Sequence, residues 1–468
     1  MSATKPQTIA VIGGGITGLA AAWTLSREAP TGTRIVLIEA EERLGGKIRT
    51  DAFDGGYVEA GADSFLARDS WTVDLCRQLG LGDELVPPRV FGAALWLNQE
   101  LRKLPPGLLF GLPTRPAACL SAPLTWAGRA RALGELVLPG PLSGNDVSVG
   151  AFVAKRFGSE VLDRLVDPLL AGTRAGRPDE MSLAAALPQI DAVARSHRSV
   201  MKGLRRQSQE GVLVDGPPPF LAVRGGMERM VDALRRELKK KIEVMVGLPV
   251  ETVRRNEGGY ELVGREPLQA NSVIITSPAF DAARLLQDLS PPAGRLLAGI
   301  EYTPSLSVTL TFPKGRIAVP QGTSGVLVPS GSGMTVSACT WWSVKWPNAA
   351  PDSFVIRCFI GRDSDDPSAS LEDEELVATC ASDVALLTGS QEVHEKSIVT
   401  RWSRGLPKYR IGHLDRVAGI ERALMESPGI AVAGAAYRGS GIPDCIRQGH
   451  EAAQNILRTP IERGNAFP

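Results

Sequence analysis

The chain has 468 residues, with 52 Lys and Arg against 51 Asp and Glu, and 43% of its residues are hydrophobic. At about 150 residues per domain, this length predicts about three domains. The balanced charge argues against a nucleic-acid-binding protein that relies on a broad basic surface. The six cysteines form no CxxC pair and the four histidines form no HxxxH pair, which argues against a zinc or iron–sulfur site. Scattered thiols favour a reducing, cytoplasmic location.

No stretch of 18 apolar residues occurs, so the sequence predicts no membrane-spanning helix. The apolar run from Ile9 to Trp23 contains three consecutive glycines, which favours a strand, a turn and a helix over a signal peptide. The segment 104–128 combines apolar residues with five prolines. It can lie on a membrane surface, line an apolar cavity or form a buried loop, and the sequence leaves these alternatives open.

The first motif follows a β-branched run at residues 8–12, which is typical of a buried parallel strand. A glycine-rich turn comes next, then a helix with apolar periodicity, and then a second strand at residues 34–38 that leads into Glu39. This arrangement is the complete dinucleotide-binding fingerprint. Its turn consists of Gly13, Gly14, Gly15, Ile16, Thr17 and Gly18.

The fingerprint assigns a physical task to each of its main positions. Gly13 makes the tight turn, Gly15 lets the backbone approach a pyrophosphate, and Gly18 lets the helix pack closely on the strand. The helix N-terminus presents unpaired N–H groups to the phosphates. Glu39 is placed to accept a ribose hydroxyl, and the adjacent Ala40 is a further candidate contact. We expect a bound dinucleotide; the alternative is a glycine-rich turn without a ligand.

The middle of the chain alternates between helical and extended patterns. Helical periodicity, interrupted by proline and glycine, predicts helices at 124–137, 147–157, 159–170, 182–195 and 197–206. A further helix is expected from Gly225 to about Lys241, followed by strands at 242–247, 250–255, 260–264 and 272–278. Alternation with a period of two over residues 302–360 then predicts an antiparallel sheet.

The C-terminal part repeats the strand, turn and helix order of the first motif. An apolar strand at 429–433 leads into a glycine-rich turn at 434–441, and a helix follows that ends near Leu457. Backbone N–H groups at the start of such a helix can stabilise negative charge on a bound group. We expect this turn and the first one to hold the same cofactor.

Nine short motifs mark the chain almost from end to end. They are GGGITGL at 13–19, ERLGGKIRT at 42–50, GADSF at 61–65, LDRLVDPLLAGTRAG at 162–176, HRSVMKG at 197–203, ACTWWSVKWPNAAP at 338–351, TRW at 400–402, LPKYRIGH at 406–413 and GIPDCIRQG at 441–449. Through them the chain resembles the porphyrinogen oxidases of haem biosynthesis, a family within the FAD-dependent amine oxidase superfamily.

The resemblance implies an α/β fold with a Rossmann-like FAD-binding domain, a mixed-sheet substrate domain and an α-helical insertion. The FAD-binding domain would comprise residues 1–87, 211–285 and 401–468. The helical insertion, which would line the substrate cavity, spans 88–210. The antiparallel-sheet substrate domain spans 286–400.

The resemblance also implies an oxidoreductase that binds FAD non-covalently. FAD would remove six hydrogens from a porphyrinogen, and O2 would re-oxidise the flavin and leave as H2O2. The motifs are more similar to the Gram-positive type, which acts on coproporphyrinogen III, than to the type that acts on protoporphyrinogen IX. Because the cofactor carries the chemistry, no catalytic side chain is assigned. A transient contact with a ferrochelatase-type enzyme is a further implied partner.

The matching motifs also suggest which residues contact the two ligands. Lys47 is the candidate cation for the cofactor phosphates, and Val250 would lie on the adenine side. Arg102 falls where plant-type relatives place an arginine for a substrate carboxylate, although an exposed hairpin charge is the alternative. The other cofactor candidates are Gly61, Ala62, Asp63, Ser64, Trp402, Ser440, Gly441 and Ile442.

One departure from the family pattern concerns the segment Gly172–Gly176. The family commonly has an aromatic residue where this chain has Arg174. Coproporphyrinogen III carries four carboxylates and protoporphyrinogen IX two, so an added cation suits the more anionic substrate. We therefore include Gly172 and Arg174 among the substrate-binding candidates; the alternative is that Arg174 points to solvent.

Other classes of protein would share part of these sequence features. A flavin amine oxidase or a carotenoid desaturase would have the same N-terminal half. Covalent amine oxidases carry a cysteine in the turn before the last helix, whereas Cys445 lies beyond that turn. A non-catalytic FAD protein that carries porphyrin is a third possibility of a different class.

Overall fold

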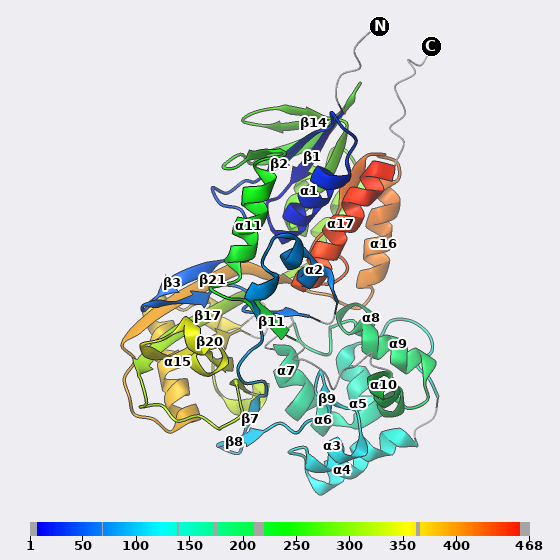
Figure 1. Cartoon of the computed structure of the whole chain (residues 1–468). Helices are drawn as coiled ribbons and strands as arrows, with labels where there is room; N and C mark the ends of the chain where they lie inside the picture. Colours follow the sequence, from blue (N-terminus) through cyan, green and yellow to red (C-terminus); the bar gives the residue numbers. More distant parts are fainter. Residues whose placement is uncertain are drawn as a thin grey trace.

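The computed structural model describes residues 7–67, 69–137, 140–171, 176–209, 220–361 and 366–458. A parallel sheet flanked by helices forms one end of the molecule, and a large sheet and a group of helices lie side by side at the other end (Figure 1). The first and last described elements both belong to the parallel-sheet end. The expected α/β architecture is confirmed.

The nucleotide-binding part is built on five parallel strands. The strand expected at residues 8–12 lies in the centre, and all of its residues are buried. A strand that is apolar on both faces needs cover on both sides, which helices supply in parallel sheets. In sheet order the strands are β12 (Glu243–Met245), β2 (Arg34–Ile38), β1 (Thr8–Ile12), β16 (Ser272–Ile275) and β22 (Ile430–Val432).

Two hydrophobic cores lie on the two faces of this sheet. Ile9 and Val11 of β1 point into one core, and Ala10 and Ile12 point into the other, as the period of two in a strand requires. The first core contains α1 (Ile16–Glu28), α2 (Trp71–Gln78), α11 (Glu228–Leu238) and α17 (Ile442–Arg458). The second contains α12 (Ala279–Leu285), α13 (Pro291–Ala298), α16 (His413–Leu424) and the antiparallel strands β13 (Val250–Asn256), β14 (Gly259–Gly264) and β15 (Leu268–Ala270).

The helices α1 and α17 come from opposite ends of the chain and lie side by side (Figure 1). A Cβ added at Gly449 of α17 would lie 2.3 Å from Thr17 O of α1. A Cβ added at Gly18 would lie 1.9 Å from Gly13 O. Packed atoms do not approach so closely. Glycine at positions 18 and 449 therefore sets the spacing between the two helices and the first turn.

The second sheet has seven strands, and every pair except β18–β7 is antiparallel. Its central strands match the alternating pattern expected at residues 302–360. In sheet order the strands are β21 (Lys396–Pro407), β17 (Tyr302–Pro313), β20 (Ser353–Ile360), β19 (Val336–Trp341), β18 (Gly325–Leu327), β7 (Ala94–Leu97) and β8 (Glu100–Lys103).

The two faces of the seven-stranded sheet differ in polarity. Leu306 and Val308 of β17 belong to a core that includes α15 (Asp373–Thr388). Ser307, which alternates with them, is a buried polar residue on the other face. Arg357 of β20 donates hydrogen bonds to Ser307 Oγ and to Gly61 O. The polar face of this sheet is therefore turned toward the nucleotide-binding part.

The strands β7 and β8 lie within residues 88–210, where we expected a helical insertion and considered a hairpin only as the alternative for Arg102; the helical expectation does not hold for residues 94–103. Asn98 and Gln99 join the two strands with φ values of 52° and 61°. These values fit a two-residue hairpin turn, which glycine usually marks in a sequence. This turn has no glycine, so the sequence signal for a hairpin there was weak.

Two other elements cross the expected domain limits. β21 runs from Lys396 to Pro407, across the limit expected at residue 400. α13 lies inside the range 286–400, yet its Leu297 packs in the second core of the parallel sheet. The division into domains by residue range stays a prediction.

The helical part has a core of its own, separate from those of the two sheets. Helices occupy each of the five ranges expected in this region, although the helix expected at 182–195 is broken, because Pro188 begins a new helix. The helices are α3 (Pro116–Ser121), α4 (Trp126–Leu133), α5 (Val149–Phe157), α6 (Ser159–Val161), α7 (Asp167–Ala171), α8 (Leu183–Ala186), α9 (Pro188–Ser196) and α10 (Val200–Gln209), with a π-helical turn at Leu162–Val166.

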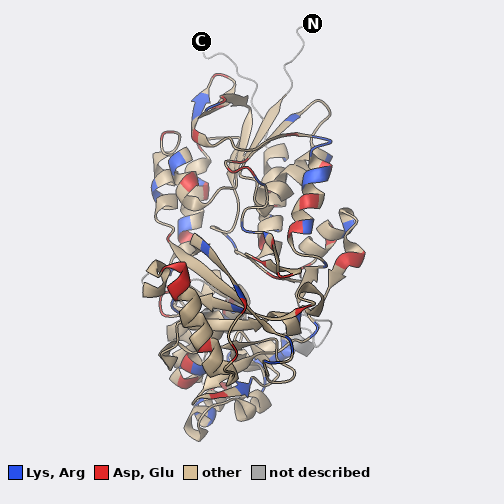
Figure 2. Ribbon diagram, turned by 90° about the vertical axis from the view of Figure 1, so that its left-hand side faces the viewer, with Lys and Arg blue, Asp and Glu red and all other residues tan. Residues whose placement is uncertain are grey.

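Short elements connect these parts. They are β3 (Thr50–Phe53), β4 (Gly56–Glu59), β5 (Phe65–Leu66), β6 (Leu85–Val86), β9 (Leu108–Leu109), β10 (Leu112–Pro113), β11 (Phe220–Val223) and α14 (Trp342–Lys345). Basic and acidic residues are interspersed over both ends of the molecule (Figure 2). None of the helices within the described residues combines the length and apolarity that crossing a bilayer requires. In segment 104–128, Leu120 and Trp126 are exposed, and contact of this segment with a membrane stays a prediction.

The spacing of α1 and α17 can be tested by one substitution. We expect Gly449→Ala to lower the free energy of unfolding by about 1–3 kcal/mol, because the added methyl group overpacks the contact with Thr17. Gly134→Ala is the matched control: φ there is −56°, and an added Cβ meets no atom within 4 Å. Urea unfolding measures both variants, and equal stability of Gly449→Ala and the native protein would contradict the packing.

Candidate cofactor site

The first glycine turn lies at the carboxyl end of β1 and leads into α1. Gly13 has a φ of +106° and donates its N–H to Ile38 O at 2.8 Å. No atom lies within 4 Å of a Cβ built at Gly15, so one side of the turn is open. Gly15 is also the N-cap of α1, and no side chain caps this helix end. The free N–H groups of α1 are therefore available to an anion.

Glu39 lies against this turn at the end of β2. Its Oε2 accepts the N–H of Gly14 at 2.6 Å, and its Oε1 accepts the N–H of Glu41 at 2.9 Å. Both bonds hold the carboxylate in place, and each oxygen keeps a lone pair for a further donor such as a ribose hydroxyl. The adjacent Ala40 is exposed.

A second glycine loop, residues 43–47, closes on the first turn. Gly45 donates its N–H to Gly14 O at 2.8 Å. Arg43 stabilises the conformation of this loop, because its guanidinium donates hydrogen bonds to two backbone carbonyls of the loop, Leu44 O and Gly46 O, both at 2.6 Å. The motif ERLGGKIRT pointed to this loop, but we assigned only Lys47 in it and missed the bracing role of Arg43.

Lys47 lies at the inner end of this loop. Its ammonium is 5.9 Å from the centre of the Tyr302 ring, and it forms no ion pair with any carboxylate among the described residues. Burial lowers the pKa of Lys47, although the nearby Cys445 acts in the opposite direction. A buried cation without an anionic partner is costly, so this position favours an anionic ligand.

The C-terminal glycine turn, residues 434–441, is braced by the motif LPKYRIGH. The Tyr409 hydroxyl donates to Ala435 O at 2.5 Å and accepts the N–H of Gly439 at 3.1 Å. His413 Nε2 lies 2.9 Å from Tyr437 O, and its ring stacks on that of Tyr409 with centroids 4.3 Å apart. We assigned no site role to Tyr409 or His413, although their motif had been singled out in the sequence.

The two glycine turns meet, as we expected. A Cβ at Gly434 would lie 3.6 Å from Thr17 Oγ1. Thr17 is also close enough to the Cys445 thiol, in the first turn of α17, to act on its pKa in the lowering direction. Gly441 O accepts the N–H of Cys445 at 2.9 Å, so Ser440 to Ile442 form the entry to this helix. The structure thus brings together candidate residues that are separated by more than 400 positions.

The stretch Tyr57–Ser64 runs between the nucleotide-binding part and the seven-stranded sheet. A Cβ at Gly61 would lie 1.9 Å from Lys47 O, so the stretch packs directly on the second glycine loop. From the sheet side, Trp402 Nε1 donates to Ala60 O at 2.9 Å, and Arg357 Nη1 donates to Gly61 O at 2.9 Å. Trp402, a predicted cofactor contact, is therefore adjacent to the predicted Gly61–Ser64 stretch.

Two buried carboxylates in this stretch behave differently. Burial raises the pKa of Asp63, but the Lys345 ammonium at 2.6 Å outweighs burial, and the pKa falls to about 2. Glu59 forms no ion pair with any described residue, the effect of Arg357 on it is small, and burial raises its pKa to about 7. Its oxygens accept the N–H of Met227 at 2.8 Å and the hydroxyl of Thr50 at 2.9 Å.

The remaining candidate residues lie outside the two glycine turns and the stretch Tyr57–Ser64. Val250 is buried at the start of β13. Arg102 lies on the edge strand β8 and pairs with Glu100 at 3.2 Å. Six strand spacings separate β8 from β21, roughly 29 Å along the sheet, so the structure does not bring Arg102 to Trp402. Gly172 and Arg174 lie outside the described residues.

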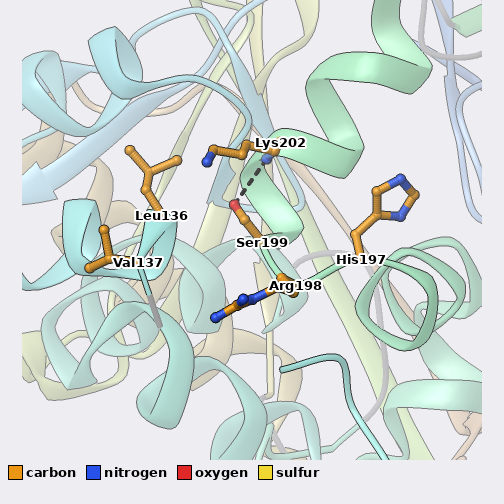
Figure 3. A pocket seen from close by; sticks show the side chains of 6 residues that line it. All are labelled: Leu136, Val137, His197, Arg198, Ser199 and Lys202. Atoms are coloured by element: carbon orange, nitrogen blue, oxygen red, sulfur yellow. Dashed lines mark hydrogen bonds between the residues drawn. The ribbon is translucent and has the colours of Figure 1, made fainter. Parts of the chain in front are cut away.

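A cavity of about 490 Å³ lies in the helical part, at the motif HRSVMKG. Figure 3 shows Arg198 and Lys202 extending toward Leu136 and Val137, while His197 points to the other side. Ser199 Oγ accepts the N–H of Lys202 at 3.2 Å at the start of α10. This cavity shares no lining residue with the two glycine turns, and the motif stabilises a helix start.

The residues present fit a phosphate-bearing cofactor. The open side of Gly15, the uncapped N-terminus of α1 and the unpaired Lys47 ammonium all favour an anion. Ser277 Oγ, just beyond the carboxyl end of β16, is buried without a hydrogen-bond partner in the described structure. The carboxyl edge of a parallel sheet is the usual place for a nucleotide.

Comparisons with known proteins agree with this geometry. Residues 16–457 match the model of the family described as flavin containing amine oxidoreductase. The chain belongs to this family. It is therefore a flavin-dependent oxidoreductase.

Relatives and solved structures show which members of the family this chain resembles. Coproporphyrinogen III oxidase of Bacillus subtilis is 33% identical over 96% of this chain and 97% of its own. Human protoporphyrinogen oxidase is 31% identical over 97% of this chain and 99% of its own. A crystal structure from Exiguobacterium sp. 255-15, assigned as a protoporphyrinogen oxidase, superposes with a TM-score of 0.86 at 31% identity, and covers 97% of this chain and 99% of that one. The resemblance to porphyrinogen oxidases is confirmed.

The raised pKa of Glu59 makes stability depend on pH. Between the ordinary value of 4.5 and about 7, the folded state holds this proton more tightly than the unfolded state. The stabilisation is therefore present at low pH and is lost as the pH rises through that window. Relative to Glu59→Gln, we expect the native flavoprotein to lose about 3 kcal/mol of unfolding free energy between pH 5 and pH 8.

Urea unfolding at the two pH values measures this difference. Glu257→Gln, at an exposed position, is the matched control, because its side chain is not buried. Parallel pH profiles for the native protein and Glu59→Gln would contradict the assignment of a buried, partly protonated carboxyl group.

Proposed function

We propose that this flavoenzyme uses FAD to oxidise coproporphyrinogen III to coproporphyrin III. The observation that carries the proposal is the 33% identity to Bacillus subtilis coproporphyrinogen III oxidase, which extends over 96% of this chain. A likeness of this extent includes both glycine turns and both sheets. It therefore covers every element that holds the candidate site.

The proposed reaction balances with oxygen as the acceptor. Coproporphyrinogen III loses six hydrogens in three two-electron steps and becomes the aromatic porphyrin. Three molecules of O2 take up these hydrogens and leave as three molecules of H2O2. FAD, when bound, accepts the electron pairs from the substrate and passes them to O2. No side chain needs to act as a general acid or base, because the pyrrole nitrogens can exchange protons with water.

The chain's own residues would bind and orient the cofactor. The Gly13–Gly18 turn and the α1 N-terminus would hold the pyrophosphate, with Lys47 nearby, and Glu39 would hold the ribose. Val250 would lie near the adenine. A dinucleotide, rather than FMN alone, is favoured because the adenine side has its own ribose acid, Glu39.

The flavin end of the cofactor would lie between the C-terminal turn and the stretch Gly61–Ser64. Ser440, Gly441 and Ile442 form the entry to α17, whose N-terminal N–H groups would stabilise negative charge at the pyrimidine edge. Trp402 and Arg357 both donate to Ala60 O, and Arg357 also donates to Gly61 O, so Trp402 and Gly61 would both be close to the ring.

Non-covalent attachment is supported by the state of Cys445. This residue lies within α17 rather than in the turn before it, and its side chain is buried. Burial raises the pKa of the Cys445 thiol to about 11, so the thiol stays protonated and is a poor nucleophile.

The substrate's four propionates call for cations near the substrate. Arg102 and Arg174, with Gly172 beside the latter, are the proposed partners. Arg102 is half-exposed and shares its charge with Glu100, which is also exposed. Its guanidinium can therefore exchange that weak pair for a substrate carboxylate.

Location and partners form part of the same proposal. A cytoplasmic location is supported by six free cysteines, among them Cys339 and Cys358, whose sulfur atoms lie 3.6 Å apart without a bond. Transfer of the porphyrin to a ferrochelatase-type enzyme is implied by the resemblance alone. Oxidation of protoporphyrinogen IX is the second candidate function, favoured by the 31% identity to the human protoporphyrinogen oxidase.

Anaerobic mixing of the purified holoenzyme with each porphyrinogen tests the proposal. We expect coproporphyrinogen III to bleach the flavin absorbance faster than protoporphyrinogen IX, because the proposed cations suit four carboxylates. Admission of O2 should restore the absorbance and yield three H2O2 per porphyrin. Faster bleaching by protoporphyrinogen IX would make that compound the substrate in place of coproporphyrinogen III. If neither compound bleaches the flavin, the proposed oxidation is contradicted and a porphyrin carrier is favoured.

A further inference from the structure

Arg357 is a buried cation that the proposed chemistry does not yet use. It lies on β20, only 3% of its surface is exposed, and its guanidinium packs 4.7 Å from the centre of the Phe359 ring. Its hydrogen-bond acceptors are all uncharged: Gly61 O at 2.9 Å, Ala60 O at 3.3 Å and Ser307 Oγ at 3.5 Å. Its Nε has no partner among the described residues.

The carboxylates around Arg357 are already engaged elsewhere. Asp63 pairs with Lys345 at 2.6 Å, and Asp51 pairs with Arg49 at 3.0 Å. Glu59 accepts hydrogen bonds from Met227 and Thr50, and burial keeps much of it protonated near neutral pH. Arg357 therefore has no ion-pair partner among the described residues. Asp63, Glu59 and Asp51 offset part of its charge from a distance, but a buried charge without a direct partner is costly.

The acceptors of Arg357 locate this charge relative to the cofactor. Ala60 O and Gly61 O belong to the stretch that packs on the second glycine loop at Lys47 O. Arg357 thus lies behind the stretch that we place along the flavin, on the polar face of the seven-stranded sheet. A flavin gains negative charge when it is reduced, so a fixed cation at this place acts more strongly on the reduced form.

We propose that Arg357 is a positioning residue with two effects on the flavin: it holds the Ala60–Gly61 backbone by both carbonyls, and its charge favours the reduced flavin. This inference rests on the proposed contact of Gly61–Ser64 with the flavin, but not on the identity of the substrate. A guanidinium is suited to both effects, because its planar fork can donate to two carbonyls at once while it stays charged.

Two substitutions separate these effects. Arg357→Lys keeps the charge but cannot span both carbonyls, and Arg357→Gln loses the charge. Arg401→Gln is the matched control from β21, which lies two strands from β20 in the same sheet, because Arg401 points to the opposite face and pairs with Asp373 at 2.7 Å. None of these comparisons requires a porphyrinogen.

The experiment measures the reduction potential of the flavin against a reference dye, with FAD in excess so that weaker binding does not hide the effect. At the wild-type midpoint potential, we expect Arg357→Gln to lower the ratio of reduced to oxidised flavin about tenfold. Arg357→Lys and Arg401→Gln should leave this ratio within about twofold. The FAD dissociation constant should rise about tenfold in both Arg357 variants, because a carbonyl loses its charged donor.

The outcomes are decisive for this inference. An unchanged potential in Arg357→Gln, or an equal shift in Arg401→Gln, would overturn the electrostatic effect. An unchanged FAD dissociation constant in Arg357→Lys would overturn the positioning effect. If Arg357→Gln does not fold, Arg357→Met replaces it, because methionine keeps an apolar stem of similar length. A wild-type reduction potential in Arg357→Met would overturn the role of the charge. A lowered reduction potential would support that role. A wild-type protein that binds no flavin would instead refute the proposed function.

Discussion

The contact between Gly449 of α17 and Thr17 O of α1, where an added Cβ would lie only 2.3 Å from the oxygen, brings the two ends of the chain together. α1 carries the first glycine turn at its N-terminus, and α17 carries the C-terminal turn at its own. Because both helices begin at the carboxyl edge of the parallel sheet, their N-terminal N–H groups face one region. A cofactor held there is bound at both of its ends by backbone rather than by flexible side chains.

The seven-stranded sheet and α14, the short helix that follows β19, contribute a second constraint by holding the stretch Tyr57–Ser64. Trp342 donates to Tyr57 O, Trp402 to Ala60 O, and Lys345 pairs with Asp63. The polar face that makes these bonds is continuous with the face beside Arg357. The part of the protein that would meet the substrate is thereby fixed against the part that would meet the cofactor, as a reaction between two bound molecules requires.

The sequence predicted the local features of the site and missed those that depend on distant pairing. The Gly13–Gly18 turn was predictable because its residues are contiguous and each glycine has a local reason. Arg357 was not, because its acceptors at residues 60 and 61 are about 300 positions away and no local pattern marks it. The hairpin at Asn98 was only the alternative reading of Arg102, since the turn lacks the glycine that normally signals a hairpin. Tyr409 lay in a recognised motif, but its role appears only when its hydroxyl meets the C-terminal turn.

A crystal structure of the flavin-loaded protein tests the central claim most directly. The account predicts one FAD per chain, with its pyrophosphate on the N–H groups at the start of α1 and the pyrimidine edge of its flavin at the start of α17. The same structure should show the flavin along Gly61–Ser64, with Arg357 behind that stretch. A flavin ring bound away from α17, or held by the first turn alone, would contradict the claim that both ends of the chain form a single site.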